Sequence, residues 1–126
     1  MKESPVLKKV SDTLGVYEFH KVVIWWERLN SGKVRSMYSG RWVGLCDKGT
    51  SDFVAVIRNR EGGLSLLFIE CKRGDGQGHL SEYQEKFRDK YKALKDVYYM
   101  EVIDSYQVKS LLERIGIDRT SEIVMP

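Results

Sequence analysis

The sequence predicts an α/β protein in which helices flank a mixed β-sheet. Segments with helical periodicity alternate with short β-rich segments along the chain. Residues 66–69 are apolar at every position, as expected for a central strand that is covered on both faces. The chain has 126 residues, of which 42% are hydrophobic and 31% charged, so we expect one globular domain over residues 1–126.

The first third of the chain is expected to form one helix and a small hairpin. Apolar side chains recur at three- and four-residue steps over residues 14–29, which predicts a helix, and turn-forming residues 30–32 would end it. Residues 34–38 and 42–45 are β-rich and are separated by a Ser-Gly pair, which predicts a hairpin.

A longer hairpin is expected next. Residues 52–57 and 64–72 are β-rich, and a turn-rich segment lies between them. If the turn centres on Glu61, Asp52 faces Glu70 across the two strands. The register therefore predicts which side chains meet.

The rest of the chain predicts a helix, a strand and a second helix. Ser81 followed by Gln84 has the spacing of a capping box, which predicts a helix over residues 81–95. Residues 96–103 are β-rich, and residues 104–115 have helical periodicity with an Asp at the N-cap position.

Composition excludes several classes of protein. The net charge of +3 and the pI near 8.8 are too low for a purely electrostatic nucleic-acid binder. The longest apolar runs, residues 22–26 and 64–69, are too short to span a membrane, and we expect no signal peptide. Cys46 and Cys71 match no metal-binding pair or disulfide framework, so we expect reduced thiols in an intracellular, cytoplasmic protein.

Two carboxylates and an ammonium are expected to converge at one end of the long hairpin. Asp52 and Glu70 would face each other with Cβ atoms about 4.5–5.5 Å apart, and Lys72 would stand beside Glu70 on the same face. Opposed like charges destabilise a sheet, and Glu70 follows an apolar stretch in which a charge is costly. A divalent cation, Mg²⁺ or Mn²⁺, would remove the conflict because carboxylate oxygens are its preferred ligands.

The expected first helix offers a third acid. Glu18 lies on its apolar stripe with Val22 and Leu29, where a charge is unexpected, so Glu18 is the candidate to reach the metal. Glu27 is the alternative. The competing interpretation of the whole pattern is structural, because Glu-x-Lys is also common on solvated edge strands.

Three blocks of the sequence carry a family resemblance. In chain order they are Gly49-Thr50-Ser51-Asp52-Phe53, Phe68-Ile69-Glu70-Cys71-Lys72-Arg73 and Leu80-Ser81-x-x-Gln84-x-x-Phe87. Together they resemble the VRR-NUC family (virus-type replication–repair nucleases) of the PD-(D/E)xK nuclease superfamily, over about residues 15 to 103. Ser51 stands where the family usually has Pro, and Cys71 stands where Val is common.

The resemblance implies a restriction-endonuclease-like core and a DNA endonuclease that depends on Mg²⁺ or Mn²⁺. Asp52, Glu70, the backbone carbonyl of Cys71 and Glu18 would hold the metal, and Lys72 would orient water or stabilise the transition state. The family's helix Gln corresponds to Gln84. Further DNA contacts are expected at Lys48, Arg73, Ser81 and His79.

The resemblance also implies a substrate and an assembly. Stand-alone phage-type members of the family act as homodimers on four-way (Holliday) junctions, leaving a 5′-phosphate and a 3′-hydroxyl, in the cytoplasm of a bacterial host. The abundant aromatic side chains, with Trp25 and Trp26 on the first helix and an apolar segment at residues 123–125, favour a dimer interface. A flap, repair or restriction-like nuclease and a catalytically inactive nucleic-acid-binding module are the alternatives.

Overall fold

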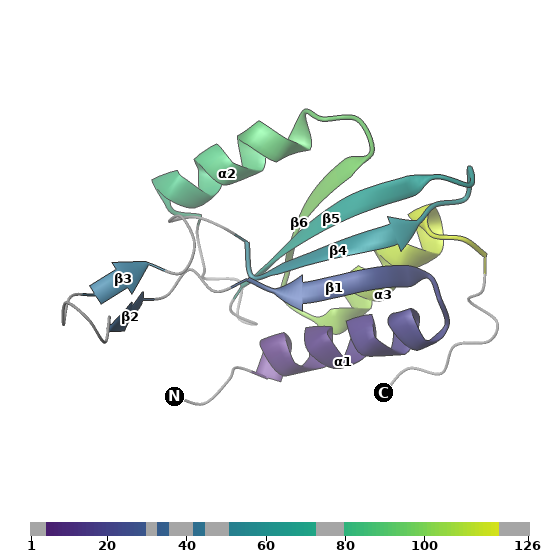
Figure 1. Cartoon of the computed structure of the whole chain (residues 1–126), viewed down its shortest axis with the longest axis horizontal. Helices are drawn as coiled ribbons and strands as arrows, with labels where there is room; N and C mark the ends of the chain where they lie inside the picture. The colour runs from purple at the N-terminus through teal and green to yellow at the C-terminus, as the bar shows by residue number, and fades with distance from the viewer. Residues whose placement is uncertain (1–4, 30–32, 36–41, 45–50, 73–79, 119–126) are drawn as a thin grey trace.

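The structure is a computed structural model that describes residues 5–29, 33–35, 42–44, 51–72 and 80–118. The elements of these ranges are, in chain order, α1 (Pro5–Phe19), β1 (Val23–Arg28), β2 (Lys33–Arg35), β3 (Trp42–Gly44), β4 (Phe53–Arg58), β5 (Leu64–Cys71), α2 (Glu82–Lys92), β6 (Val97–Val102) and α3 (Ser105–Ile115) (Figure 1). No helix in this part of the chain is long and apolar enough to cross a membrane.

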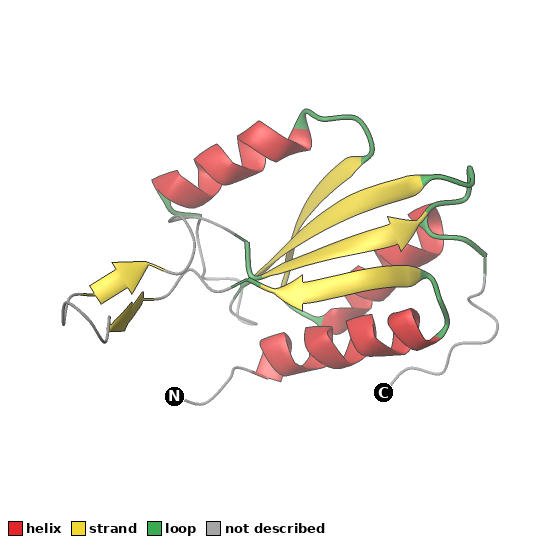
Figure 2. Ribbon diagram, in the orientation of Figure 1, coloured by secondary structure: helices red, strands yellow, loops and turns green. Residues whose placement is uncertain are grey.

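The main sheet has the strand order β1-β4-β5-β6. β1, β4 and β5 are antiparallel neighbours, whereas β6 is parallel to β5, so the sheet is mixed. Helix α2 lies on one face, and α1 and α3 lie on the other (Figure 2). The general α/β class, a mixed sheet flanked by helices, is confirmed.

The hydrophobic core lies between the sheet and helices α1 and α3. Its strand residues occupy alternate positions of β4 and β5, and its helix residues form one stripe on each helix. Fully buried members include Val10, Leu14, Tyr17, Phe53, Ala55, Ile57, Leu67, Ile69, Val108 and Leu112. Burying a large apolar side chain stabilises a fold by about 1.5–3 kcal/mol. This core therefore sets the alternation of β4 and β5 and turns the intervening side chains toward the α2 side.

The helix expected over residues 14–29 is wrong in its position. Helix α1 begins at Pro5 and ends at Phe19, and the chain then reverses near Lys21, which has a φ of 63°. Residues 23–28 form β1, which pairs with β4. The run of β-branched and tryptophan residues suits a strand as well as a helix, and pairing with β4 decides between them.

Both expected hairpins are present, although residues 36–38 and 45 of the smaller one lie outside the described residues. β2 pairs with β3, and β4 pairs with β5 in the predicted register, with Phe53 opposite Ile69. At the long hairpin's turn the N–H of Asn59 donates to the carbonyl of Gly63 at 3.0 Å, and Gly62 has a φ of 86° that favours glycine. The central position of β5 in the sheet is also confirmed.

The later elements follow the sequence closely. Helices α2 and α3 both begin with complete capping boxes, Ser81 with Gln84 and Asp104 with Gln107. Helix α2 ends at Lys92, three residues before the expected end. β6 and α3 lie at the expected positions.

Candidate functional site

Asp52, Glu70 and Lys72 are brought together where β4 begins and β5 ends. Because Phe53 pairs with Ile69, the next pair outward is Asp52 opposite Glu70. Asp52 Oδ2 accepts a hydrogen bond from the backbone N–H of Cys71 at 2.8 Å. The backbone of β5 therefore holds the Asp52 carboxylate beside the second acid.

The Glu70 side chain is buried within this group, with only 5% of the residue exposed. Glu70 Oε1 accepts a hydrogen bond from Gln84 Nε2 at 2.8 Å. Glu70 Oε2 is buried and has no hydrogen-bond partner in the described part of the chain. A buried, ionised oxygen without a partner is costly, so this atom requires a proton or a positively charged ligand.

The two acids also disturb each other's protonation. Burial and, secondly, the nearby Asp52 raise the pKa of Glu70 to about 8, although Lys72 lowers it. Burial likewise raises the pKa of Asp52, and the Cys71 N–H, Arg28 and Lys72 lower it. Because the acids are coupled, the metal-free pair favours holding a proton near neutral pH.

Gln84 connects helix α2 to both Glu70 and Lys72. Its Oε1 accepts from the Ser81 N–H at 2.8 Å, which closes the capping box, and from Lys72 Nζ at 3.3 Å. Its Nε2 is the donor to Glu70. One amide therefore orients a carboxylate and an ammonium while it caps the helix.

An aromatic cluster holds α2 against the sheet behind this amide. Phe68, which lies two residues before Glu70, packs against Phe87 and Tyr91 with ring centroids 5.1 and 4.8 Å away. Because Phe87 follows Gln84 by three residues, this contact sets the position of the first turn of α2. The same packing that anchors the helix thus keeps Gln84 at the carboxylate.

Glu18 is not brought to this group. It is exposed near the end of α1, where Val22 accepts a hydrogen bond from Arg58 at the far end of β4 (Figure 1). At about 3.3 Å per residue, the length of β4 places Glu18 about 20 Å from Asp52. Sequence reasoning chose Glu18 because it placed residues 14–29 on a single helix.

Glu27 is the acid of β1 that lies nearer to Asp52. It is exposed and sits opposite Val54, while the Leu29 N–H donates to the Asp52 carbonyl at 2.8 Å. Glu27 is therefore a diagonal neighbour of Asp52 on the α2 side of the sheet, at about 7–8 Å. It lies at the rim of the pair and outside direct contact.

The donor set suits a hard divalent cation with several water ligands. In the described residues no three Asp, Glu, His or Cys side chains gather closely enough to hold a metal. Asp52 and Glu70 are two carboxylate donors, and the Cys71 backbone carbonyl directly follows Glu70 in the sequence, with the Cys71 side chain packed toward the core. Mg²⁺ binds through few carboxylates and keeps its waters. The unpartnered Glu70 Oε2 is the atom that a cation would satisfy.

Two residues near the site were missed by sequence reasoning. Arg28 lowers the pKa of Asp52 from the neighbouring strand. Tyr99 lies opposite Phe68 on β6, and its buried hydroxyl has no hydrogen-bond partner in the described part of the chain. Burial and, secondly, the charge of Glu70 raise the Tyr99 pKa far above its usual value. The Tyr99 hydroxyl is therefore close enough to the site to be affected by the Glu70 charge. The sequence leaves open the pairing of β1 with β4, which places Arg28, and the parallel pairing of β5 with β6, which places Tyr99.

Of the other predicted DNA-contacting residues, the structure describes only Ser81. Ser81 is exposed at the N-terminus of α2, beside Gln84. Lys48, Arg73, His79 and residues 123–125 lie outside the described residues.

Comparisons of the chain with protein-family models, curated proteins and solved structures found no match.

Proposed function

We propose that this protein is a metal-dependent DNA endonuclease with a PD-(D/E)xK-like core. The observation that carries the proposal is Oε2 of Glu70, which is buried in an inner strand beside Asp52 and has no hydrogen-bond partner among the residues that the structure describes. An unsatisfied carboxylate in an inner strand destabilises the metal-free fold, whereas a site that takes up a cation requires such a carboxylate.

Asp52, Glu70 and the Cys71 carbonyl would hold Mg²⁺ or Mn²⁺. When bound, the cation would supply an activated water and neutralise charge at the scissile phosphate. The Cys71 N–H holds the Asp52 carboxylate in place, and Gln84 holds Glu70 Oε1, which leaves Oε2 as the available oxygen.

Lys72 supplies the positive side chain of the proposed reaction. Gln84 Oε1 holds its ammonium at 3.3 Å, on the side of the sheet that carries both acids. An ammonium so placed stabilises the additional negative charge that a phosphate develops during attack. Its strand position two residues after Glu70 keeps it close to the proposed ligands but leaves it outside the ligand set.

The proposed substrate is branched DNA, and the proposed assembly is a homodimer. Both rest on the family resemblance, since two symmetric nicks in a four-way junction suit a two-fold symmetric enzyme. Sedimentation should then give about twice the chain mass of 14.6 kDa.

Cleavage of a labelled four-way junction and of a linear duplex, each with Mg²⁺, Mn²⁺ or EDTA, tests the proposal. We expect cleavage only with metal, and a loss of at least about a hundredfold in Asp52→Asn and Glu70→Gln because each removes a metal ligand. Glu61→Gln is the matched control, because Glu61 is exposed in the turn at the opposite end of the same hairpin. Lys72→Ala should lose rate while it still binds Mn²⁺ in calorimetry.

Three outcomes would count against the proposal. Near-normal turnover of Asp52→Asn or Glu70→Gln in Mg²⁺ would show that the site is assigned wrongly. Binding of the junction with no cleavage in any metal would indicate a nucleic-acid-binding module. A monomer that cuts only flaps would indicate a repair nuclease.

A further inference from the structure

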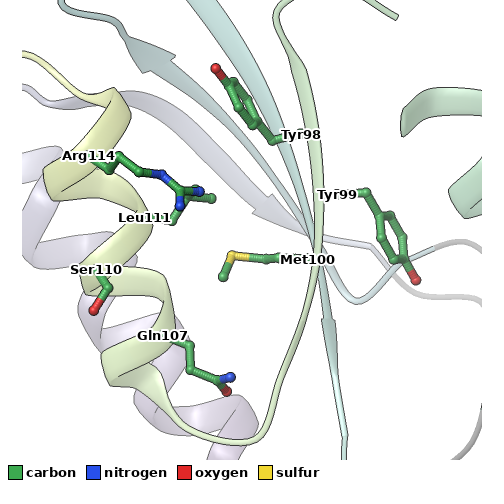
Figure 3. A pocket seen from close by; sticks show the side chains of 7 residues that line it. All are labelled: Tyr98, Tyr99, Met100, Gln107, Ser110, Leu111 and Arg114. Carbon is green, nitrogen blue, oxygen red and sulfur yellow. The ribbon is translucent and has the colours of Figure 1, made fainter. Parts of the chain in front are cut away.

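A recess lies between the edge strand β6 and helix α3 (Figure 3). Its volume is about 380 Å³, within the range of small-molecule sites, which is about 300–1,000 Å³. The lining residues are Tyr98, Tyr99, Met100, Gln107, Ser110, Leu111 and Arg114. The recess is therefore large enough for a small organic molecule.

The strand side of the recess is apolar. Tyr98 and Met100 are half-buried, and the Met100 side chain points from β6 toward α3, whereas the Tyr99 ring turns to the other side of the strand (Figure 3). Leu111 is buried on the facing helix. An aromatic ring, a thioether and a leucine together suit a flat aromatic group.

The helix side is polar and carries one positive charge. Gln107, Ser110 and Arg114 follow each other at three- and four-residue steps and so share one face of α3. Arg114 is the only charged residue among the described residues of the lining, and it forms no ion pair with any of the described chain. Its side chain extends toward β6 (Figure 3). A guanidinium fork without an acid partner matches the geometry of a phosphate group.

The position of Arg114 also has a simpler explanation that a test must separate. A cation in the last turn of a helix stabilises the helix by about 0.3–1 kcal/mol through the helix dipole. That effect requires only positive charge, so Arg114→Lys preserves it. Recognition of a phosphate by two parallel hydrogen bonds requires the fork itself.

We propose that this recess binds one nucleotide unit, with its base against Tyr98 and Met100 and its phosphate at Arg114. The unit is either a free mononucleotide or an unstacked nucleotide of single-stranded DNA, which present the same chemistry. Met100 and Glu101 are adjacent in β6 and point to opposite faces, so the recess lies on the α3 face of the sheet, opposite to the face that carries Glu101 and its ladder partner Glu70. Nucleotide binding there does not depend on the proposed nuclease activity.

Titration of the metal-free protein, followed by NMR signals of the Met100 methyl group and the Tyr98 ring, tests this proposal. The probes are dAMP, deoxyadenosine, inorganic phosphate, a single-stranded oligodeoxynucleotide and the corresponding duplex. We expect dAMP or the single strand to bind at least about tenfold more tightly than deoxyadenosine, phosphate or duplex, because only they offer both an accessible base and a phosphate. The dAMP and single-strand arms distinguish the two sources of the nucleotide.

Three variants locate the binding. Arg114→Lys should weaken it by about tenfold with unchanged stability, and Ser110→Phe, at an exposed helix position, should abolish it by filling the recess. Lys8→Gln on α1 is the control for loss of a positive charge elsewhere, because the Lys8 side chain is 71% exposed and, within the described residues, forms an ion pair with Asp12 alone. Asp52→Asn should bind dAMP as the wild type does.

Several results would overturn the proposal. They are the absence of binding by dAMP and by the single strand at millimolar concentration, equal binding of phosphate and dAMP, or wild-type affinity in both Arg114→Lys and Ser110→Phe. Nucleotide binding without DNA cleavage in either Mg²⁺ or Mn²⁺ would refute the nuclease proposal and support the recess. DNA cleavage without nucleotide binding would support the nuclease proposal and refute the proposal for the recess.

Discussion

Replacing Glu70 by Gln should stabilise the metal-free protein at high pH. Burial, and secondly Asp52, raise the pKa of Glu70 from 4.5 to about 8 in the folded protein. A carboxyl with a higher pKa in the folded state favours folding in its protonated form. Its contribution is therefore fully present below about pH 4.5 and is lost as the pH rises through about 8. Glutamine does not ionise, so the variant avoids this loss.

The size of the effect follows from the pKa. At about 1.4 kcal/mol per pH unit, a change from 4.5 to about 8 corresponds to about 5 kcal/mol. Water entry, relaxation around Glu70 and sharing of the proton with Asp52 reduce this value. We therefore expect the variant to exceed the wild type by about 2–3 kcal/mol at about pH 9, and by less than about 1 kcal/mol at about pH 4. The new amide oxygen can still accept the hydrogen bond from Gln84.

Urea unfolding with EDTA at several pH values measures this difference. Glu61→Gln serves again as the exposed control and should follow the wild type at every pH. Added Mg²⁺ should stabilise the wild type according to its affinity and leave Glu70→Gln unchanged, because a ligand that binds only the folded state raises stability. A Glu70→Gln protein that is less stable than the wild type at high pH, or a difference that does not grow with pH, would refute the reasoning.

Two further substitutions, each with a matched control, test the surroundings of the carboxylates. Gln84→Ala and Gln107→Ala each break a capping box and should each lower the free energy of unfolding in urea by about 1 kcal/mol. Only Gln84→Ala should also weaken Mn²⁺ binding in calorimetry, because only Gln84 donates a hydrogen bond to Glu70. Equal Mn²⁺ affinity in the two variants would remove Gln84 from the site. Tyr99→Phe deletes a buried hydroxyl without a described partner and should be neutral or up to about 1 kcal/mol stabilising, whereas the exposed Tyr106→Phe should change little. A larger loss in Tyr99→Phe would show that this hydroxyl is bonded.

The elements that the sequence predicted well are those with local signals. The turn at Asn59–Gly63 and the alternation of the two strands determine the register, and the register alone places Asp52 opposite Glu70. The capping boxes at Ser81 and Asp104 define two helix starts in the same local way.

The parts that were predicted wrongly depend on distant partners. Residues 22–29 carry spacing compatible with a helix and a composition compatible with a strand, and only pairing with β4 makes them β1. That error also displaced the third acid, because it put Glu18 and Glu27 on one helix. The recess beside β6 could not be predicted from the sequence either, since it depends on how α3 crosses the edge strand.

Burial argues against the structural interpretation of the Glu-x-Lys pattern. On a solvated edge strand, Glu70 would be exposed, its pKa would be ordinary and Lys72 would suffice as its partner. Instead β5 lies between β4 and β6, Glu70 is buried, and its pKa is raised although Lys72 is nearby. Phe68 and Ile69 keep the strand in place from both faces, so the chain cannot move the acid into water without losing core contacts. A destabilised carboxylate held by rigid packing is the arrangement expected where binding of a cation, and not stability, determines the residue.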